Sequence, residues 1–441
     1  MKKNTVENLK TLIRAGRGTI PATTVIQNGT LVNVMTGEIY PADIAIYQDT
    51  IVAVGDVADY IGEKTERVDA KGRYLCPGLI DGHIHSECSK LSITSYSKAV
   101  VPHGTTSMIS GLDEYISVSG LEGLKEIFKE VEASPLKVFW GAPYKTPYTN
   151  PKSTVAFNFT PEVHEEVQKW PECNGVWEVV REAIIEEDED ALGALALAHS
   201  NRLPIFGCAP MARGKDLNGY LCSGVRLDHE SYTHEEVVEK MRNGMHMLMR
   251  ESTITRFMEE NIRAVTEVNP ALARRVSFCT DDVTATGIME EGHLDRVVRM
   301  AIRAGVSPVT AIQMATINSA EAYRLDDKIG SITPGKFADI LFVEDLTKFI
   351  VRSVMVEGKV VAHDYKLNYK LTPPVRTGVL VGKLKCALTT EADFAYKVDL
   401  ANGTAEVLSM DVKAPFVRKR RDVVLKVRDH IVMPDTEQDV A

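Results

Sequence analysis

The sequence predicts an α/β protein in which a (β/α)8 barrel carries a small β-sandwich domain built from both chain termini. Three observations predict it. Eight β-rich segments alternate with helix-compatible stretches between residues 77 and 330, short strands with turns precede them, and the strand pattern returns after them. Strands that alternate with helices pair in parallel, because a parallel connection needs a crossover. Eight such units are what a closed, TIM-like barrel requires.

The small domain is predicted from the patterns on either side of the barrel. In TTVIQNGTLVNV and DIAIYQDTIVAVG, alternating apolar residues are interrupted by turn residues, which is typical of hairpins. The pattern changes at Cys76-Pro77-Gly78, so residues 1–76 form its predicted N-terminal part. After Gly330, strands return in KIGSITPGKFADILFVED and FIVRSVMVEGKVVA. Residues 331–441 are therefore expected to complete this domain and to add a short β extension.

The barrel itself is assigned to residues 77–330. Its helices carry recognisable end signals: Thr233 and Glu236 form a capping-box pattern, Gly305 ends one helix and Pro308 begins the next. The predicted strands are Leu79–His83, Thr105–Ile109, Leu136–Trp140, Gly175–Val179, Leu203–Gly207, Gly224–Asp228, His246–Met249 and Val276–Thr280.

Composition excludes several classes of protein. The 441 residues are 44% hydrophobic and 25% charged, close to the averages of folded globular chains. Because no apolar run is long enough for a secretory signal or a bilayer span, we expect a cytoplasmic protein with no membrane partner. The formal net charge of -10 argues against a nucleic-acid partner. The seven cysteines form no C-x-x-C pair, so neither a disulfide framework nor a zinc knuckle is indicated.

Chemistry-bearing residues follow several predicted barrel strands. His83 and His85 are one residue apart on an extended chain, so both imidazoles can reach one metal ion. Glu178, His229 and Asp281 follow the fourth, sixth and eighth strands. Each alone could be a helix-start residue. Because strand ends of a barrel converge on one mouth, the five together predict a metal site.

Longer stretches of the chain resemble the amidohydrolase superfamily. PGLIDGHIHSECS is similar to its first-strand motif, and SITPGKFADILFVED to its return into the small β domain. Within the superfamily the closest resemblance is to adenine deaminases, through LDHESYTHEEVVEKMRNGM, MRES, FCTDD and EGHLDRVVRMAIRAGVSPVTAIQMATINSAEAY. The resemblance covers nearly the whole chain.

The resemblance implies a role for each strand-end residue. His83, His85 and Asp281 would bind one metal ion, Glu178 would bridge, and His229 would bind a second. One or two divalent ions (Zn, Mn, Fe or Co) are therefore expected. A metal-activated water would attack an electrophilic carbon, and Asp281 would pass the water's proton to the leaving nitrogen. Glu178 and Glu87 are the other expected catalytic carboxylates.

The chain departs from adenine deaminases at two positions. Cys208 stands where they carry a histidine at the end of the fifth strand, and as a thiolate it could still be a metal ligand. In Leu112-Asp113-Glu114, Asp113 replaces another histidine. The residues expected to bind substrate are Asp113, Glu230, Arg250 and His293. A packing role for His293 and a structural ion pair for Arg250 are the alternatives.

The expected function is metal-dependent hydrolysis of a carbon-nitrogen bond in a small molecule, as in adenine deaminases. One alternative is a hydrolase of a different amide, carbamate or thiocarbamate on the same scaffold, because function depends on the site and not on the fold. The other is a non-catalytic barrel that binds a small molecule. Since two imidazoles are replaced, the sequence favours only weak deamination of adenine. We also expect a homo-oligomer.

Overall fold

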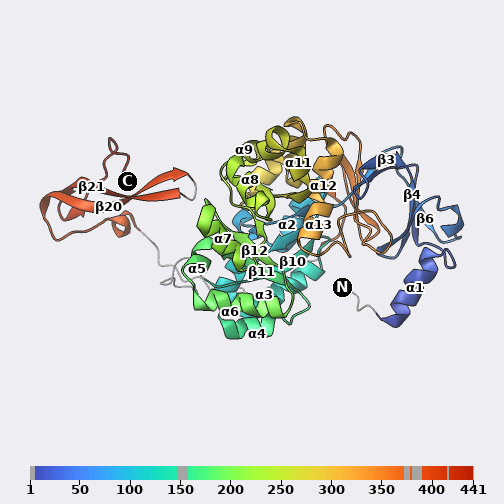
Figure 1. The fold of residues 1–441 in the computed structure, drawn as a ribbon, viewed down its shortest axis with the longest axis horizontal. Helices are drawn as coiled ribbons and strands as arrows, with labels where there is room; N and C mark the ends of the chain where they lie inside the picture. The colour runs from blue at the N-terminus through green and yellow to red at the C-terminus, as the bar shows by residue number, and fades with distance from the viewer. Residues whose placement is uncertain (1–4, 147–156, 372–377, 380–389, 415–416, 441) are drawn as a thin grey trace. The chain divides into compact units, whose positions relative to one another are not determined.

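The computed structural model describes residues 5–146, 157–371, 378–379, 390–414 and 417–440. The chain divides into two compact units, Met1–Val381 and Gly382–Ala441. The first holds the barrel and the β-sandwich, and the second holds an antiparallel sheet (Figure 1). The predicted divisions at residues 76/77 and 330/331 stay predictions.

The barrel is a sheet of eight parallel strands in chain order. The last strand returns to the first: the amide of Gly82 donates to Phe278 O at 3.1 Å and that of Asp281 to His83 O at 2.9 Å. These bonds close the barrel beside the candidate metal residues. All eight predicted strands are confirmed, with ends shifted by up to three residues. They are β8 (Leu79–Asp81), β9 (Thr105–Ser110), β10 (Lys137–Pro143), β11 (Cys173–Val180), β12 (Ile205–Cys208), β13 (Leu227–Asp228), β14 (His246–Arg250) and β15 (Val276–Cys279).

Helices connect the strands on the outside of the barrel (Figure 1). Side chains of the strands fill its interior, joined by residues of the last helix and of the segment after it. Among these, Tyr323 donates a hydrogen bond from its hydroxyl to the carbonyl of Gly82, next to His83. The helices are α2 (Ile93–Val100), α3 (Asp113–Glu132), α4 (Pro161–Val167), α5 (Arg181–Ile185), α6 (Glu189–Ser200), α7 (Gly214–Cys222), α8 (His234–Arg242), α9 (Met258–Asn261), α10 (Ala285–Glu291), α11 (Leu294–Arg303), α12 (Pro308–Ala315) and α13 (Ile317–Ala322).

The predicted helix ends are largely confirmed. Helix α12 begins at Pro308, and Gly305 adopts φ +104° just after α11, a left-handed conformation that glycine tolerates. Thr233 caps α8 by accepting from the amide of Glu236. The prediction of a full capping box is wrong in its second half. The Glu236 carboxylate does not return to the Thr233 amide but accepts from Lys240 and from the amides of Met211 and Tyr232.

The β-sandwich is composite, as the sequence predicts. Its four-stranded sheet has the order β5-β4-β1-β6, and its seven-stranded sheet has the order β19-β18-β17-β16-β7-β2-β3, which joins strands from both sides of the barrel sequence. A shared apolar core that includes Ile26, Ile44, Leu75 and Phe342 lies between the sheets. The strands are β1 (Thr24–Gln27), β2 (Thr30–Asn33), β3 (Glu38–Pro41), β4 (Asp43–Tyr47), β5 (Thr50–Gly55), β6 (Glu66–Asp69), β7 (Tyr74–Pro77), β16 (Ile340–Val343), β17 (Val351–Val356), β18 (Lys359–His363) and β19 (Lys366–Leu367).

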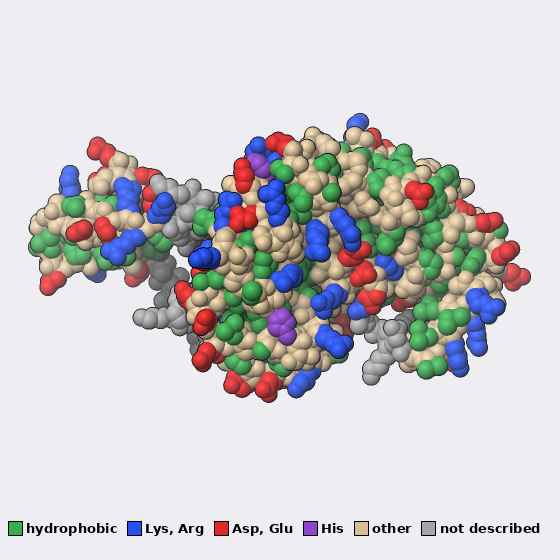
Figure 2. Space-filling view, viewed as in Figure 1, with side chains coloured by type: hydrophobic (Ala, Val, Ile, Leu, Met, Phe, Trp, Pro, Cys, Tyr) green, Lys and Arg blue, Asp and Glu red, His purple; other side chains and the backbone are tan. Residues whose placement is uncertain are grey.

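A helix precedes the sandwich, and a small sheet forms the second unit. Helix α1 (Val6–Gly16) precedes the sandwich and buries Ala15 against Val25 and Val52. The second unit is a three-stranded sheet of β20 (Asn402–Ala414), β21 (Val417–Arg428) and β22 (Ile431–Val432), in the place of the predicted β extension. Across the described residues, no helix combines the length and apolarity that a membrane crossing needs. On the face shown in Figure 2, basic and acidic side chains are interspersed.

Candidate active site

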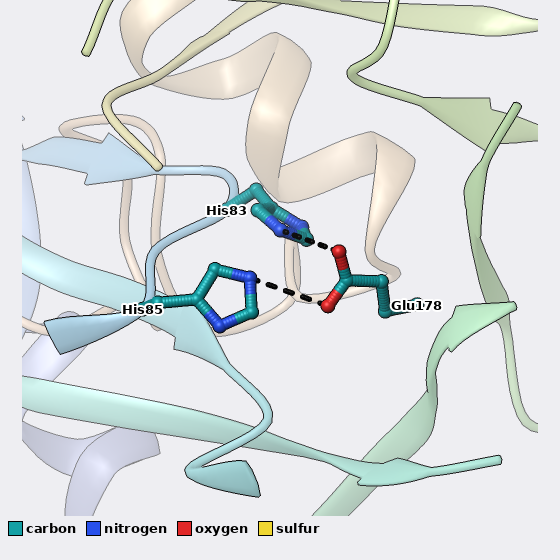
Figure 3. Close-up of side chains that lie close together, drawn as sticks. All are labelled: His83, His85 and Glu178. Carbon is teal, nitrogen blue, oxygen red and sulfur yellow. Dashed lines mark ion pairs between the residues drawn. The ribbon is translucent and has the colours of Figure 1, made fainter. Parts of the chain in front are cut away.

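Two histidines and one glutamate form the centre of the site. His83 and His85 follow β8, and Glu178 projects toward them from β11 (Figure 3). Glu178 Oε2 lies 3.2 Å from His85 Nε2, and Oε1 lies 3.9 Å from His83 Nε2. The two imidazoles and the carboxylate therefore face one point, as their strand-end positions predict.

Asp281 and His229 complete the predicted constellation. Asp281 Oδ1 lies 3.5 Å from His83 Nε2 and 3.6 Å from His85 Nε2. His229 Nε2 lies 3.8 Å from Glu178 Oε1, and its ring stacks on that of His83 with centroids 3.6 Å apart. The Nδ1 atom of His229 hydrogen-bonds Gly207 O, which leaves Nε2 directed into the site.

The backbone is unusual at two of these carboxylates. Glu178 has φ +53° and Asp281 has φ +55°, backbone angles that residues other than glycine rarely adopt. At Glu178 the pairing of β11 with β12 also shifts register between Val176 and Val179. Such strain persists only where the surrounding structure enforces it, and it is concentrated at functional sites. In both cases it turns a carboxylate into the barrel mouth.

Cys208 lies on the side of His229. The Sγ atom of Cys208, a carboxylate oxygen of Glu178 and a ring nitrogen of His229 lie within 4.8 Å of one another. Burial, followed by the neighbouring Glu178 and Glu230 charges, raises the pKa of the Cys208 thiol well above its usual value. In the protein without a metal the thiol is therefore neutral at physiological pH, and it becomes a strong ligand only by losing its proton.

Electrostatics distinguish the three histidines. Burial and neighbouring cationic groups hold the pKa values of His83 and His229 well below the usual range. Burial alone would lower the pKa of His85 too, but Glu178 and Asp113 raise it well above its usual value. Burial also raises the pKa of Glu178 to about 7 and that of Asp281 to about 6. A cation bound among these groups would favour their deprotonated forms.

The donor set fits one or two divalent metal ions. Three groups of donors each lie within 4.8 Å: His83, His85 and Glu178; His83, His229 and Asp281; and Glu178, Cys208 and His229. The Nε2 atom of His83 is buried and has no hydrogen-bond partner within the described residues. Buried polar atoms are rarely left so, and a metal ion would satisfy this nitrogen. The ligand roles of these residues stay predictions.

Arg250 and Glu230 form a charged wall of the site. The buried Arg250 guanidinium, at the end of β14, contacts the Glu230 carboxylate, lies 2.5 Å from Asp281 Oδ2 and 3.0 Å from Asp282 Oδ2. Arg250 is thus in ion pairs within the protein, whereas its neighbour Glu251 pairs with Arg296. Glu230 Oε2 is buried and has no hydrogen-bond partner within the described residues. Substrate binding by either residue stays a prediction.

Acidic residues gather on the other side of His85. Its Nδ1 atom lies 3.4 Å from Asp113 Oδ1 and 3.5 Å from Glu114 Oε1, both at the start of α3. Glu87 accepts from the Ser86 hydroxyl at 3.1 Å. Burial and the charges of Glu114 and Asp113 raise its pKa well above the usual value. The structure therefore places Asp113 directly against a candidate ligand, where it can fix the ring orientation of His85. The predicted catalytic role of Glu87 and substrate role of Asp113 are not tested by this geometry.

His293 lies behind the predicted ligands. Its Nδ1 bonds the Thr105 hydroxyl and its Nε2 bonds the Tyr96 hydroxyl, both at 2.8 Å. Asp81 Oδ2 lies 3.5 Å from the same Nε2, and burial lowers the pKa of His293 to about 3. The ring is thus neutral, and both of its nitrogens have protein partners. A direct contact with substrate stays a prediction.

Some residues of the site were missed by the sequence analysis. The indole of Trp177 stacks on His83, with ring centroids 4.1 Å apart. Asp81 accepts from the Thr280 hydroxyl at 2.5 Å and from the His83 amide at 3.3 Å, which ties β8 to the end of β15. Trp177 directly precedes Glu178 in β11, and Asp81, the last residue of β8, lies two residues before His83, so their positions could have marked them.

Comparisons with known proteins agree with this geometry. Residues 74–361 match the amidohydrolase family. Over 432 residues the chain is 73% identical to adenine deaminase 1 of Desulfotalea psychrophila, covering 98% of this chain and 73% of that protein. It is 55% identical over 433 residues to adenine deaminase 1 of Latilactobacillus sakei, with the same coverage.

The fold is also found in a solved structure. A zinc-bound adenosine deaminase from Xanthomonas campestris superposes with a TM-score of 0.56 at 15% identity, covering 79% of this chain and 94% of that one. At this identity the likeness shows the fold alone. The family match, the two relatives and the barrel geometry lead to one conclusion: the chain belongs to the amidohydrolase family and is a metal-dependent hydrolase of carbon-nitrogen bonds.

Proposed function

We propose that this hydrolase deaminates adenine or a closely related 6-aminopurine. The observation that carries the proposal is the convergence of His83, His85, Glu178, His229 and Asp281 on one point, in a chain 73% identical to an adenine deaminase. The reaction would add water to the ring carbon that bears the amine and release ammonia, converting adenine and water into hypoxanthine and ammonia.

The proposed site holds one or two divalent ions. His83, His85 and Asp281 would form the first position, His229 and Cys208 the second, and Glu178 would lie between the two. Nitrogen and oxygen donors of this kind suit Zn, Mn, Fe and Co, so the donor set selects no single metal. Ions bound there would polarise a water molecule and lower its pKa toward neutrality.

Asp281 is the proposed proton carrier. Its carboxylate lies beside both histidines of the first position, so it can accept a proton from water and return it to the leaving amine. The guanidinium of Arg250 fixes its second oxygen. Glu178 would orient the water from the opposite side, and the acidic group of Glu87 and Asp113 would bind hydrogen-bond donors of the substrate.

Carboxylates suit the recognition of an aminopurine. Adenine presents an exocyclic amine and one ring N–H, both donors, and carboxylate oxygens only accept. Glu230 is 5% exposed, and its Oε2 atom is buried without a hydrogen-bond partner in the described chain. In the ionised form of Glu230, which Arg250 and bound metal ions favour, this atom would accept a hydrogen bond from a donor of the substrate. We therefore propose Glu230 as a substrate contact. Asp113, Arg250 and His293 are the other proposed substrate-binding residues.

Cys208 and Asp113 replace two imidazoles of adenine deaminases, and both side chains lie within the candidate site. Cys208 lies close enough to Glu178 and His229 to act as a ligand in the histidine's place. Asp113 keeps a direct contact with His85. We accordingly propose adenine as the main substrate and carbamate or thiocarbamate hydrolysis as the outcome that would replace it.

The test is a substrate panel with purified protein loaded with Zn, Mn, Fe or Co in turn. Adenine, adenosine, a carbamate and a thiocarbamate are assayed for ammonia or amine release and for the second product. We expect adenine to react fastest and to give ammonia and hypoxanthine in equal amounts. Asp281→Asn, prepared in parallel, should lack the activity, which excludes a contaminating enzyme. No ammonia from adenine under any metal would overturn the proposal.

The remaining expectations belong to the same proposal: a cytoplasmic location, a homo-oligomeric assembly, and neither nucleic acid nor membrane as a partner. They rest on the sequence. Light scattering coupled to size-exclusion chromatography measures the assembly, and a monomer at micromolar concentration would contradict it.

A further inference from the structure

A fully buried lysine lies next to the candidate site. Lys240 Nζ, on α8, donates at 2.7 Å to Asp228 Oδ2, to Ala209 O and to Glu230 O, and at 2.6 Å to Glu236 Oε1. It also lies 3.0 Å from the Ser231 hydroxyl, and its side chain is 0% exposed. An ammonium offers only three protons, so these five oxygens share them. None of these partners is one of the proposed metal ligands.

The partners of Lys240 belong to two adjacent strand ends. Ala209 follows Cys208 at the end of β12, and Asp228 precedes His229 at the end of β13. Asp228 itself connects them, because its Oδ1 accepts from the Ala209 amide at 2.8 Å while its Oδ2 binds Lys240. The ammonium and this carboxylate therefore fix the backbone on which Cys208 and His229 are carried.

A tyrosine extends this network to the third strand end. The buried Tyr220 hydroxyl, on α7, accepts from the Cys208 amide at 3.0 Å and donates to Val179 O at 2.5 Å. Val179 follows Glu178 in β11. The ends of β11, β12 and β13 are thus linked in one series, and they carry Glu178, Cys208 and His229, the residues of the proposed second metal position.

The first metal position is held differently. The amide of Asp281 donates to His83 O, and that of His85 to Asp281 O. Asp81 binds the Thr280 hydroxyl and the His83 amide. None of these bonds involves Lys240 or Tyr220. The two halves of the site therefore have largely separate supports, which meet at Glu178 and through Glu230, whose backbone binds Lys240 and whose carboxylate contacts Arg250.

We propose that Lys240 and Tyr220 are positioning residues for the second metal position, through the backbone of Cys208 and His229 and, for Tyr220, of Glu178. The inference rests on the proposed two-ion site. Metal ions tolerate only small displacements of their ligands, and removing a residue that orients ligands typically weakens metal binding 10- to 100-fold. Loss of Lys240 also leaves Asp228 and Glu236 buried without a compensating cation.

The experiment compares Lys240→Met, Tyr220→Phe and a matched control with the wild type. Lys137→Met is the control, because Lys137 is also a largely buried lysine, paired with Asp339 at 2.9 Å at the start of β10. Metal-free protein is titrated with Zn or Co, and elemental analysis gives metals per chain after desalting. Circular dichroism and thermal unfolding establish that each variant is folded.

We expect the wild type and Lys137→Met to bind two ions. In Lys240→Met and Tyr220→Phe the first ion should bind with unchanged affinity, within about twofold, while the second requires at least about tenfold more metal. A general loss of stability would weaken both ions together, so the difference between them is the informative quantity.

Three results would overturn the inference. One is normal binding of both ions in Tyr220→Phe, whether or not Lys240→Met folds. Another is an equal loss of both ions in either variant. The third is a wild type that never exceeds one ion per chain. If that one-ion protein still deaminates adenine, the proposed function stands while this inference fails.

Discussion

Arg250 Nη1 lies 2.5 Å from Asp281 Oδ2, so a cation from the seventh barrel strand holds the carboxylate that follows the eighth. The same guanidinium contacts Glu230 and Asp282. One buried guanidinium is thus paired with three carboxylates. This arrangement connects the proposed proton carrier to the proposed substrate contact through a single side chain.

Replacing Arg250 should reduce turnover more than it affects substrate binding. In Arg250→Met we expect kcat to fall about 100-fold, roughly 3 kcal/mol of barrier, because Asp281 is no longer held beside the histidines. Steady-state kinetics with adenine measures this, and Arg256→Met is the control, since Arg256 is half-exposed and pairs with Glu291. A raised KM with unchanged kcat would instead identify Arg250 as a substrate ligand only.

His85→Ala should abolish turnover while the fold is retained. The variant removes an imidazole that faces both Glu178 and Asp281, and with it one of the proposed ligands of the first metal. Activity and metals per chain are measured together. His199→Ala, an exposed histidine on α6, should behave as the wild type. If His85→Ala retains more than about a tenth of the wild-type rate, the assignment is contradicted, since a lost ligand should cost more than about 1.4 kcal/mol of barrier.

The site residues that could be predicted from the sequence are those that lie at or just after the end of a barrel strand. Buried parallel strands read as short apolar runs, and His83, Glu178, His229 and Asp281 each follow such a run. A barrel brings these ends together whatever the details of packing. The constellation could therefore be predicted without knowledge of any distance.

Long-range partners could not be predicted in the same way. Lys240 stands in the polar sequence EEVVEKMR, where an exposed pair with Glu236 is the ordinary interpretation. It is buried because Asp228 and Ala209 meet it from two strand ends. Similarly, the bonds of His293 to Tyr96 and Thr105 span nearly 200 residues of sequence, and nothing local to His293 indicates them.

Asp281→Asn should lower kcat far more than it weakens binding of a substrate analogue. The amide fills the same space but cannot accept a proton. Asp282→Asn is the matched comparison, because Asp282 binds Arg250 and the Cys88 thiol and does not face the histidines, so its effect should be milder. Kinetics and inhibitor binding are measured on both variants. A reversed order of the two effects would assign the proton transfer to Asp282.

Cys208→His should strengthen binding of the second metal ion. Burial and nearby carboxylates raise the pKa of the Cys208 thiol, so a metal must displace its proton, whereas a neutral imidazole binds directly. We expect higher occupancy at limiting metal and a weaker dependence of that occupancy on pH. Metal titrations at two pH values measure both. Unchanged occupancy in Cys208→His would show that the thiol is not a ligand.

In the metal-free protein, the free energy of unfolding should decrease as pH rises from about 6.5 to 8. Burial raises the pKa of Glu178 and Asp81 to about 7 and that of Glu230 to about 8. Over this range these carboxylates hold protons in the folded state that the unfolded chain has lost. The free energy of unfolding therefore decreases with pH.

The histidines do not cancel this effect. In the folded state the pKa values of His83 and His229 are lowered, so these residues stabilise the folded protein as pH rises. This gain ends near pH 6.5, the pKa of histidine in the unfolded chain. Above that pH they are neutral in both states. His85, with its raised pKa, adds to the loss. We expect the metal-free protein to lose about 1 kcal/mol or more of stability between pH 6.5 and 8.

Metal binding should reverse the trend, because the ions would bind deprotonated Glu178 and their charge would favour the ionised forms of Asp81 and Glu230 nearby. Thermal unfolding of chelator-treated and metal-loaded protein at pH 6.5, 7.2 and 8 provides the measurement. The gain in Tm on adding metal should be largest at pH 8. Metal-free protein whose stability is constant or rises over this range would mean that these carboxylates are already ionised in the empty site, and that the cluster of acids and histidines is not prepared for a cation.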